Sequence, residues 1–262
     1  MSFAAAAGKT ADTTIHTDTQ GLVHGDFPLP VADGPVAAYY AAPEGRQDLP
    51  IVLVVQEIFG VHEHIKDLCR RLAKAGYLAV APELYQRQGD AASYTDIPKL
   101  ISELVAKVPD EQVYGDLDAS VAWAAQHGGD PGRVGVTGFC WGGRLTWMYA
   151  AHNPRVKAGV AWYGKVASGH GPLIKQMAVD VAGRIHGPVL GLYGAKDESI
   201  PLADLDVMKQ RLAAGNAAAQ ASQFVVYPEA GHAFLADYRP SYVKSAAEDG
   251  WKRMLDWFGR YL

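Results

Sequence analysis

The segment Gly138-Phe139-Cys140-Trp141-Gly142 constrains the fold of this 262-residue chain more than any other part of its sequence. It follows a short apolar run, residues 134–137, and leads into a stretch of helical character at residues 144–151. Strand, sharp turn and helix in this order are the context of a nucleophile elbow. Glycines allow the tight turn, which lifts the central residue above the end of a sheet. That residue is Cys140, so the segment predicts a strand–turn–helix unit that presents a thiol.

The rest of the chain alternates between apolar runs and segments of helical periodicity. Ile51-Val52-Leu53-Val54-Val55 is a continuous apolar run, as expected of a strand buried on both faces of a parallel sheet. We expect further strands at residues 36–40 (as an edge strand), 78–81, 156–162, 189–193 and 223–226, and helices at 64–74, 96–105, 110–126, 202–214 and 241–261. The pattern predicts a single-domain α/β-hydrolase fold over residues 21–262, with a mostly parallel sheet flanked by helices. Residues 1–20 lack periodicity and are expected to form a loosely ordered tail.

Composition excludes several classes of function. A net charge of −4, with no long basic run, argues against nucleic-acid or anionic-membrane partners. The two cysteines, Cys69 and Cys140, form no disulfide framework and suit a reducing compartment. The alanine run at residues 4–7 is too short for a signal-peptide core, and no apolar stretch approaches the roughly 20 residues that span a bilayer. We expect a cytoplasmic protein that needs no cofactor and acts on a small molecule, as a monomer or dimer.

Partners for Cys140 occur in the order that α/β-hydrolases require, with the acid before the histidine. Asp197 follows the expected strand at residues 189–193, and His232 follows the one at 223–226. His232 is expected to activate the sulfur and later protonate the leaving group, while Asp197 fixes its tautomer. Glu198 and Glu229 are neighbouring acids, but Glu229 lies too close to the histidine in sequence to replace Asp197 easily. A lone cysteine is usually a small buried hydrophobe, so the functional interpretation depends on the elbow and these ordered partners.

Two backbone N–H groups are candidates for an oxyanion hole. The Trp141 N–H follows the nucleophile directly, and the Ile58 N–H lies in the loop after the strand at residues 51–55. Glu57 occupies the exit of the same strand, where an unpaired carboxylate would be costly. It is either a structural salt-bridge partner or a carboxylate that can exchange a proton with Cys140.

Four segments together resemble the dienelactone hydrolase (carboxymethylenebutenolidase) family over most of the chain, from about Ile51 to the C-terminus. They are Gln56-Glu57-Ile58-Phe59-Gly60, Pro82-Glu83-Leu84-Tyr85 with Arg87, Gly138-Phe139-Cys140-Trp141-Gly142-Gly143, and Ala230-Gly231-His232-Ala233-Phe234. The resemblance implies a Cys140–His232–Asp197 triad, with Glu57 as the partner of the thiol in the resting enzyme.

The same resemblance bears on substrate binding. It implies that Arg87 binds a substrate carboxylate, and that Tyr85, Trp141 and Phe234 line the pocket. The family's second arginine is replaced by Ala236, and Arg239 lies near enough in sequence to substitute for it. The loss of this arginine weakens the prediction of a carboxylated substrate and leaves the prediction of hydrolase chemistry unchanged.

The leading hypothesis is a lactone or ester hydrolase that forms a covalent thioester on Cys140. A broader esterase or thioesterase of the same fold is the alternative, and a non-catalytic binding module is a third. His62-Glu63-His64 resembles a metal pair, but residues two apart do not share a helix face, so we expect a solvated helix start and no metal. Tyr163 follows an expected strand, and core packing is its expected role rather than lining the pocket.

Overall fold

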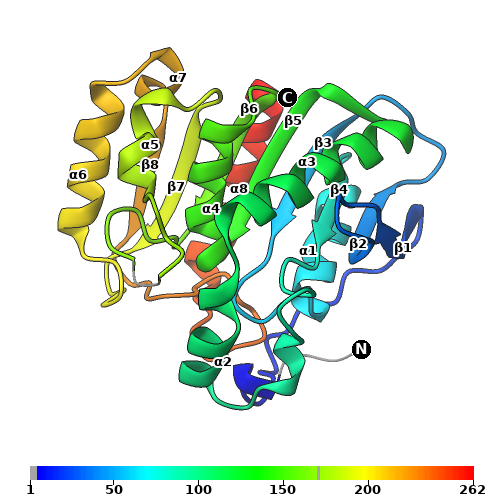
Figure 1. The fold of residues 1–262 in the computed structure, drawn as a ribbon, viewed down its shortest axis with the longest axis horizontal. Coiled ribbons are helices and arrows are strands. Elements are labelled where there is room, and N and C mark those ends of the chain that lie inside the picture. Colours follow the sequence, from blue (N-terminus) through cyan, green and yellow to red (C-terminus); the bar gives the residue numbers. More distant parts are fainter. Residues whose placement is uncertain (1–4, 170–171) are drawn as a thin grey trace.

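An eight-stranded sheet forms the centre of the computed structural model, which describes residues 5–169 and 172–262 (Figure 1). The strand order is β1-β2-β4-β3-β5-β6-β7-β8. β2 runs antiparallel to both β1 and β4, and every other pair is parallel. The strands are β1 (Leu22–Leu29), β2 (Val36–Pro43), β3 (Leu49–Val55), β4 (Leu78–Pro82), β5 (Gly129–Phe139), β6 (Val156–Trp162), β7 (Val189–Gly194) and β8 (Gln223–Tyr227).

Helices cover both faces of this sheet. In Figure 1, α3 and α4 cross in front of the central strands, and α8 lies behind them. The α-helices are α1 (Glu63–Lys74), α2 (Ile97–Glu103), α3 (Asp110–Gln126), α4 (Trp141–His152), α5 (Ala178–Val181), α6 (Leu202–Ala213), α7 (Ala217–Gln220) and α8 (Lys244–Tyr261). The mostly parallel α/β architecture expected from the sequence is thus confirmed.

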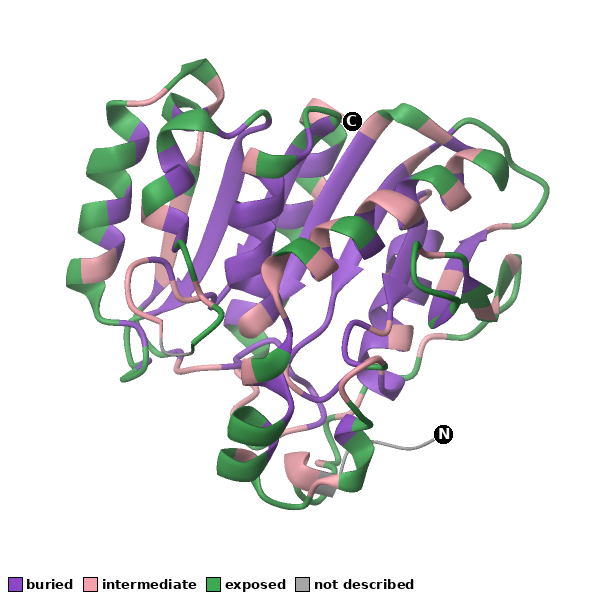
Figure 2. Cartoon of the chain, in the orientation of Figure 1, coloured by how far each residue is buried: buried purple, intermediate pink, exposed green. Residues whose placement is uncertain are grey.

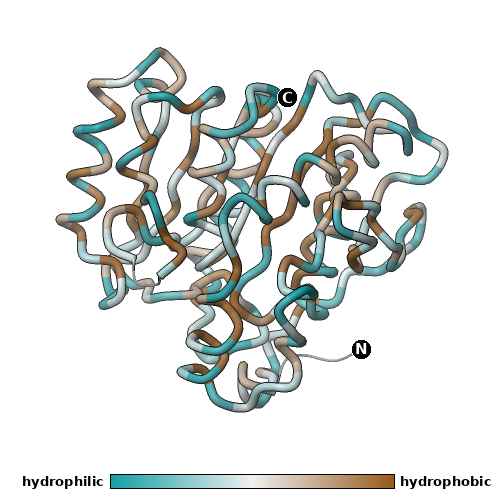
Figure 3. The backbone as a smooth tube through the Cα atoms, viewed as in Figure 1, coloured by the Kyte–Doolittle hydropathy of each residue, from teal (hydrophilic) through white to brown (hydrophobic). Residues whose placement is uncertain are grey.

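The central strands are buried on both faces because their sequences are apolar without alternation. In β3, every residue except Pro50 is buried, and all five residues of β4 are buried. Figure 2 shows the middle of the sheet as continuously buried, and Figure 3 shows hydrophobic residues running along the same strands. Burial of apolar surface between two helical layers is the main force that holds this sheet together.

The edge of the sheet differs from the prediction. An edge strand was expected at residues 36–40, but β2 pairs on both sides and β1 forms the edge. β1 contains Gly25 and Pro28 and is largely solvent-accessible, so it carries no apolar run. Proline is tolerated in an edge strand because one side of the strand needs no backbone donor.

Several helix boundaries also differ. α4 begins at Trp141, immediately after Cys140, and not near Arg144. α2 ends at Glu103 and is followed by a 3-10 turn, Val105–Lys107, while α8 begins only at Lys244. Across residues 5–169 and 172–262, no helix has both the length and the apolar character needed to cross a bilayer.

Candidate active site

The turn between β5 and α4 holds Cys140 in a strained backbone conformation. Its φ is 55° and its ψ is −113°, whereas most non-glycine residues avoid positive φ. Close packing maintains this conformation: a β-carbon on Gly142 would lie 2.5 Å from the Gln56 carbonyl oxygen, and one on Gly138 would overlap the Gly142 carbonyl. The glycines are therefore required because backbone segments touch there. The strain projects the thiol from the end of the sheet, as expected of an elbow.

Three loops bring the other polar groups to Cys140. Asp197 follows β7, His232 follows β8 and Glu57 follows β3. These strands are parallel, so their carboxyl ends meet at one edge of the sheet, where ligands usually bind in such folds. The His232 Nε2 atom lies 3.1 Å from the Cys140 Sγ atom, and its Nδ1 atom lies 2.6 Å from Asp197 Oδ2.

Asp197 is fixed by a second set of hydrogen bonds. The Ser199 hydroxyl donates to Asp197 Oδ1 at 2.6 Å, and the Ser199 N–H donates to the same oxygen at 2.9 Å. Burial raises the pKa of Asp197, but the hydrogen bonds from His232 and Ser199 outweigh burial and hold it below its ordinary value. The carboxylate is thus ionised at neutral pH and can orient the imidazole.

The environment of His232 predicts at which pH its ring loses its proton and how stability depends on pH. Burial of the ring opposes its charge, but the Cys140 sulfur and the Asp197 carboxylate raise its pKa from 6.5 to about 10. A raised pKa in the folded state contributes stability that is complete below about pH 6.5 and is lost as the pH rises toward 10. We expect the His232 ring signal in NMR to titrate well above pH 6.5, and the Cys140→Ala substitution to lower that pKa. A wild-type titration below 6.5 would contradict this assignment.

A cavity of about 450 Å³ opens above the elbow. This volume lies within the usual range for small-molecule sites, roughly 300–1,000 Å³. Several of the site residues expected from the sequence line it, namely Cys140, His232, Glu57, Ile58, Trp141 and Arg239. Trp141 is the first residue of α4, so its N–H has no partner within the helix and is suited to receive an oxyanion.

Glu57 lies inside this cavity, bonded to a tyrosine. The Tyr238 hydroxyl donates to Glu57 Oε2 at 2.8 Å, and His62 Nε2 lies 3.8 Å from the same oxygen. Burial raises the pKa of Glu57, but the interaction with His62 and the charges of His64 and Arg239 lower it to about 2. The carboxylate is therefore negatively charged near a sulfur whose hydrogen-bond partner in the structure is His232.

Three of the residues expected to bind the substrate, Tyr85, Phe234 and Arg87, lie outside the cavity lining. Tyr85 is fully buried behind it, with its ring centroid 4.9 Å from that of Trp141 and its hydroxyl donating to the Glu57 carbonyl at 3.4 Å. Phe234 is fully buried against the rings of Trp162 and Tyr163. The structure does not bring Arg87 to the cavity, and Ala236 is buried as well.

The Arg87 guanidinium instead forms two carboxylate pairs. It donates to both oxygens of Asp116 at 2.8 Å and to both oxygens of Asp33 at 2.7 and 2.8 Å. Bidentate pairing of this kind uses most of the donors that an arginine offers. In this structure Arg87 ties α3 to the loop before β2.

We predict that Arg87→Ala lowers the free energy of unfolding by about 1–3 kcal/mol, because the buried Asp116 carboxylate loses its partner. Turnover of small esters should change little, since Arg87 does not face Cys140. Urea unfolding and kcat/KM, measured on the same preparation, check both parts. Lys252→Ala, which removes an exposed pair with Asp256, is the control and should change stability by less than about 0.5 kcal/mol. A large rise in KM with unchanged stability would contradict this role.

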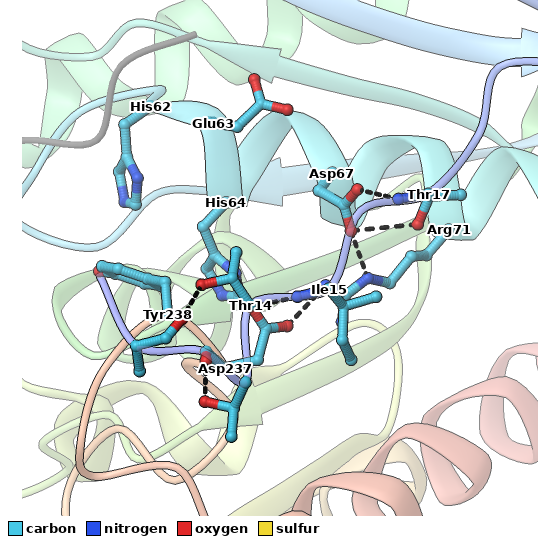
Figure 4. Close-up of polar contacts among 12 residues, drawn as sticks. Thr14, Ile15, Thr17, His62, Glu63, His64, Asp67, Arg71, Asp237 and Tyr238 are labelled. Atoms are coloured by element: carbon cyan, nitrogen blue, oxygen red, sulfur yellow. Dashed lines mark hydrogen bonds and ion pairs between the residues drawn. The ribbon is translucent and has the colours of Figure 1, made fainter.

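The expectation of a solvated helix start at His62-Glu63-His64 is wrong. The three residues are only 8%, 5% and 2% exposed. Figure 4 shows the cause: the N-terminal segment and the loop at Asp237 and Tyr238 pack over the start of α1.

Hydrogen bonds hold the N-terminal segment there. Thr17 donates to both oxygens of Asp67, and the Thr13 hydroxyl donates to the Asp237 carbonyl at 2.6 Å. Arg71 bridges the Asp67 and Asp237 carboxylates (Figure 4). Within the described part of the chain, no three His, Cys, Asp or Glu side chains are placed to hold a metal ion.

Sequence reasoning missed Ser199 and preferred core packing over pocket lining for Tyr163. Ser199 lines the cavity and bonds Asp197, although nothing in the sequence distinguishes it from other loop serines. Tyr163 also lines the cavity, with its ring centroid 5.3 Å from that of His232. Its buried hydroxyl has no hydrogen-bond partner among the described residues. Its position directly after β6, at the carboxyl edge of the sheet, was the available signal.

The fold and the geometry at the elbow define an enzyme of the α/β-hydrolase class. The dienelactone hydrolase family model matches residues 36–262, and the chain belongs to this family.

Relatives match over nearly the whole chain. A Methylorubrum extorquens protein named "Putative carboxymethylenebutenolidase" is 58% identical over 96% of this chain and 86% of its own length. An Escherichia coli K12 protein of the same name is 54% identical over 99% of this chain and 95% of its own. The crystal structure of a "Putative Dienelactone Hydrolase" from Klebsiella pneumoniae has a TM-score of 0.88 and 57% identity, covering 92% of this chain and 99% of that one.

Proposed function

We propose that this chain hydrolyses a lactone or small carboxylic ester through a covalent thioester on Cys140. The contacts of His232, 3.1 Å from the sulfur and 2.6 Å from Asp197, carry this proposal. A base held between a nucleophile and an orienting carboxylate is the arrangement that nucleophilic catalysis requires. The relatives' name, carboxymethylenebutenolidase, agrees with a lactone or ester substrate.

The first half of the reaction acylates the sulfur. The Cys140 thiol proton passes to His232 Nε2, a transfer that the raised pKa of His232 beside the ionised sulfur favours, and the sulfur attacks the carbonyl carbon. The N–H groups of Ile58 and Trp141 stabilise the oxygen anion that develops. As the carbon–oxygen bond breaks, His232 returns its proton to the leaving oxygen, and a thioester remains. In a lactone, the leaving oxygen stays attached to the acyl group.

The second half releases the acid. His232 takes a proton from water, and the resulting hydroxide attacks the thioester carbonyl. Collapse of the tetrahedral intermediate breaks the carbon–sulfur bond, and the sulfur regains its proton from His232. Asp197 remains ionised throughout and stabilises the imidazolium in both halves.

Trapping the acyl group tests this chemistry. The protein is mixed with p-nitrophenyl acetate, quenched in acid and digested for mass spectrometry. We expect an acetyl group on the peptide that carries Cys140, and its removal by hydroxylamine, which cleaves thioesters. The Cys140→Ser variant should hold a longer-lived ester at the same position. An acetyl group on Cys69 or on lysines alone, with Cys140 unmodified during turnover, would refute the proposal.

Glu57 is proposed to restrain the thiol until substrate arrives. An ionised carboxylate in a shared cavity opposes a second negative charge on the sulfur. A thiol that stays protonated is also oxidised more slowly than a thiolate. We expect Glu57→Gln to raise the rate at which iodoacetamide alkylates Cys140 in the absence of substrate, by about tenfold. An unchanged or slower rate in this variant would contradict the role.

Arg239 is proposed as the residue that binds an anionic group of the substrate. Its guanidinium lies over the Phe59 ring at 5.4 Å and lines the cavity, and within the described ranges no carboxylate lies within 4.0 Å of it. Lactones with and without a free carboxylate separate the roles. Arg239→Gln should raise KM for the carboxylated lactones alone, and equal effects on both would reject the assignment.

A broader esterase activity is the second candidate function, because most of the side chains that line the cavity are apolar.

We also propose that the reaction takes place in the cytoplasm. Two cysteines that are both free are compatible with a reducing compartment.

A further inference from the structure

One end of the active-site cavity is lined almost entirely by hydrocarbon. From the side of α2 and the following 3-10 turn, Ile97, Ile101, Val105 and Val108 face the cavity. Leu173, Ile174 and Met177 face it from the segment that precedes α5. We call these seven residues the apolar arm site. None of these residues has a role in the proposed catalytic mechanism.

Two charged side chains that line the cavity, Arg144 and Asp110, neutralise each other. Arg144 donates to both oxygens of Asp110, at 2.8 and 2.7 Å, and also to the Gln176 carbonyl at 2.6 Å. A paired guanidinium of this kind does not offer a free charge to a ligand. Arg239, which has no carboxylate within 4.0 Å in the described part of the chain, lines the cavity from the loop after His232, near Glu57 and Phe59. The cavity therefore has a polar part around Cys140 and a non-polar part between α2 and α5.

Two exposed aliphatic side chains of the apolar arm site indicate that this site binds a ligand. Ile101 is 44% exposed and Leu173 is 37% exposed, although both are large aliphatic residues. Scattered exposed hydrophobics need no explanation, but these two face one cavity that leads to the nucleophile. Covering them with the hydrocarbon of a ligand would remove apolar surface from water, which is favourable.

We propose that the apolar arm site binds a hydrocarbon substituent of the substrate, so that the preferred substrates are esters or lactones carrying an aliphatic arm of several carbons. This inference depends on the proposed hydrolase function, because the arm is positioned by the ester bound at Cys140. The arm belongs to either the acyl or the alcohol side of the ester. The chemistry of recognition is the same for both, and substrate series distinguish them.

Two ester series test the proposal. One lengthens the acyl chain from acetate to hexanoate as p-nitrophenyl esters, and the other lengthens the alcohol of simple alkyl acetates. In one series, kcat/KM should rise about fourfold with each methylene, or on the order of 10²-fold across four methylenes. A flat profile in both series would overturn the inference.

Ile101→Ser tests the site itself. Because Ile101 lies on the surface of α2, its replacement should not unfold the protein. The ratio of kcat/KM for hexanoate to that for acetate should fall by about fivefold to tenfold. Val207→Ser on α6 removes a side chain that is 42% exposed and does not line the cavity, and the ratio should stay as in the wild type. An unchanged ratio in Ile101→Ser would exclude the apolar arm site as the cause of a chain-length preference.

A binding experiment separates this inference from the hydrolase proposal. Hexanoate and acetate are compared as protectants of Cys140 against iodoacetamide, a measurement that requires no turnover. Hexanoate should protect at concentrations at least tenfold lower than acetate, and Ile101→Ser should narrow that difference. If no ester is hydrolysed but hexanoate still protects selectively, the hydrolase proposal fails; the apolar arm site then binds hydrocarbon, but its assignment to the arm of an ester substrate is overturned. If esters are hydrolysed but the two acids protect equally, only the apolar arm site fails.

Discussion

Replacing Cys140 with alanine is expected to lower kcat/KM for small aryl esters by about 10⁴-fold or more, close to the rate without enzyme. The substitution removes the atom that forms the covalent bond, while the neighbouring Asp197, His232 and backbone N–H groups remain. Those groups can still polarise a carbonyl, but water would have to replace the sulfur as nucleophile. Steady-state hydrolysis of p-nitrophenyl acetate and of an unsubstituted lactone measures the loss.

Controls distinguish lost chemistry from lost folding. Cys140→Ala should melt within a few degrees of the wild type, since the side chain is small and partly exposed. Cys69→Ala is the matched variant, because Cys69 is fully buried in α1 and remote from the elbow. It should keep full activity per folded molecule. Should Cys140→Ala keep more than about 1% of wild-type activity, a different residue must be the nucleophile.

Replacing Gly142 with alanine is expected to cost roughly 3 kcal/mol or more of folding free energy. The added β-carbon would lie 2.5 Å from the Gln56 carbonyl oxygen and would overlap the Val55 carbonyl. Both obstacles are backbone atoms at the end of β3, so no side-chain rotation can relieve the contact. The strand or the elbow must move, and either displacement separates Cys140 from His232. Activity should fall along with stability.

Gly115→Ala in α3 is the matched control for this substitution. Its β-carbon meets no atom within 4 Å, and alanine favours the helix by about 0.5–1 kcal/mol over glycine. Urea unfolding should therefore show opposite changes for two chemically identical substitutions. Equal stability of the two variants would mean that the close approach of the β3 and α4 backbones is not required.

The sequence predicted the core of the sheet well because its signals are local. The apolar run at residues 51–55 and the glycine-flanked Cys140 each determine the structure of their own segment. β1 was missed because Gly25 and Pro28 interrupt any strand-like pattern, and its pairing with β2 is a contact between segments. β1 forms because the neighbouring sheet offers it a strand to pair with, and a local stretch of the sequence carries no information about that neighbour.

In the candidate site, too, features with a local sequence signal could be predicted, and features that depend on contacts between distant segments could not. The positions of Asp197 and His232 could be predicted, because parallel strands bring their carboxyl ends to one edge. The burial of His62 and His64 could not, since it depends on contacts such as that between Thr13 and Asp237, which lie 224 residues apart. Arg87 shows why a sequence motif alone does not predict a role. It matches the motif of the substrate-binding arginine, but its guanidinium is paired with Asp33 and Asp116.

The two cysteines lie in opposite environments. Cys69 is fully buried, which raises its pKa far above the ordinary value, whereas Cys140 faces the cavity. A mild alkylating reagent should therefore modify one thiol per native chain. The number of groups incorporated would then count the molecules with an intact site, so that rate constants from different preparations can be compared per active molecule.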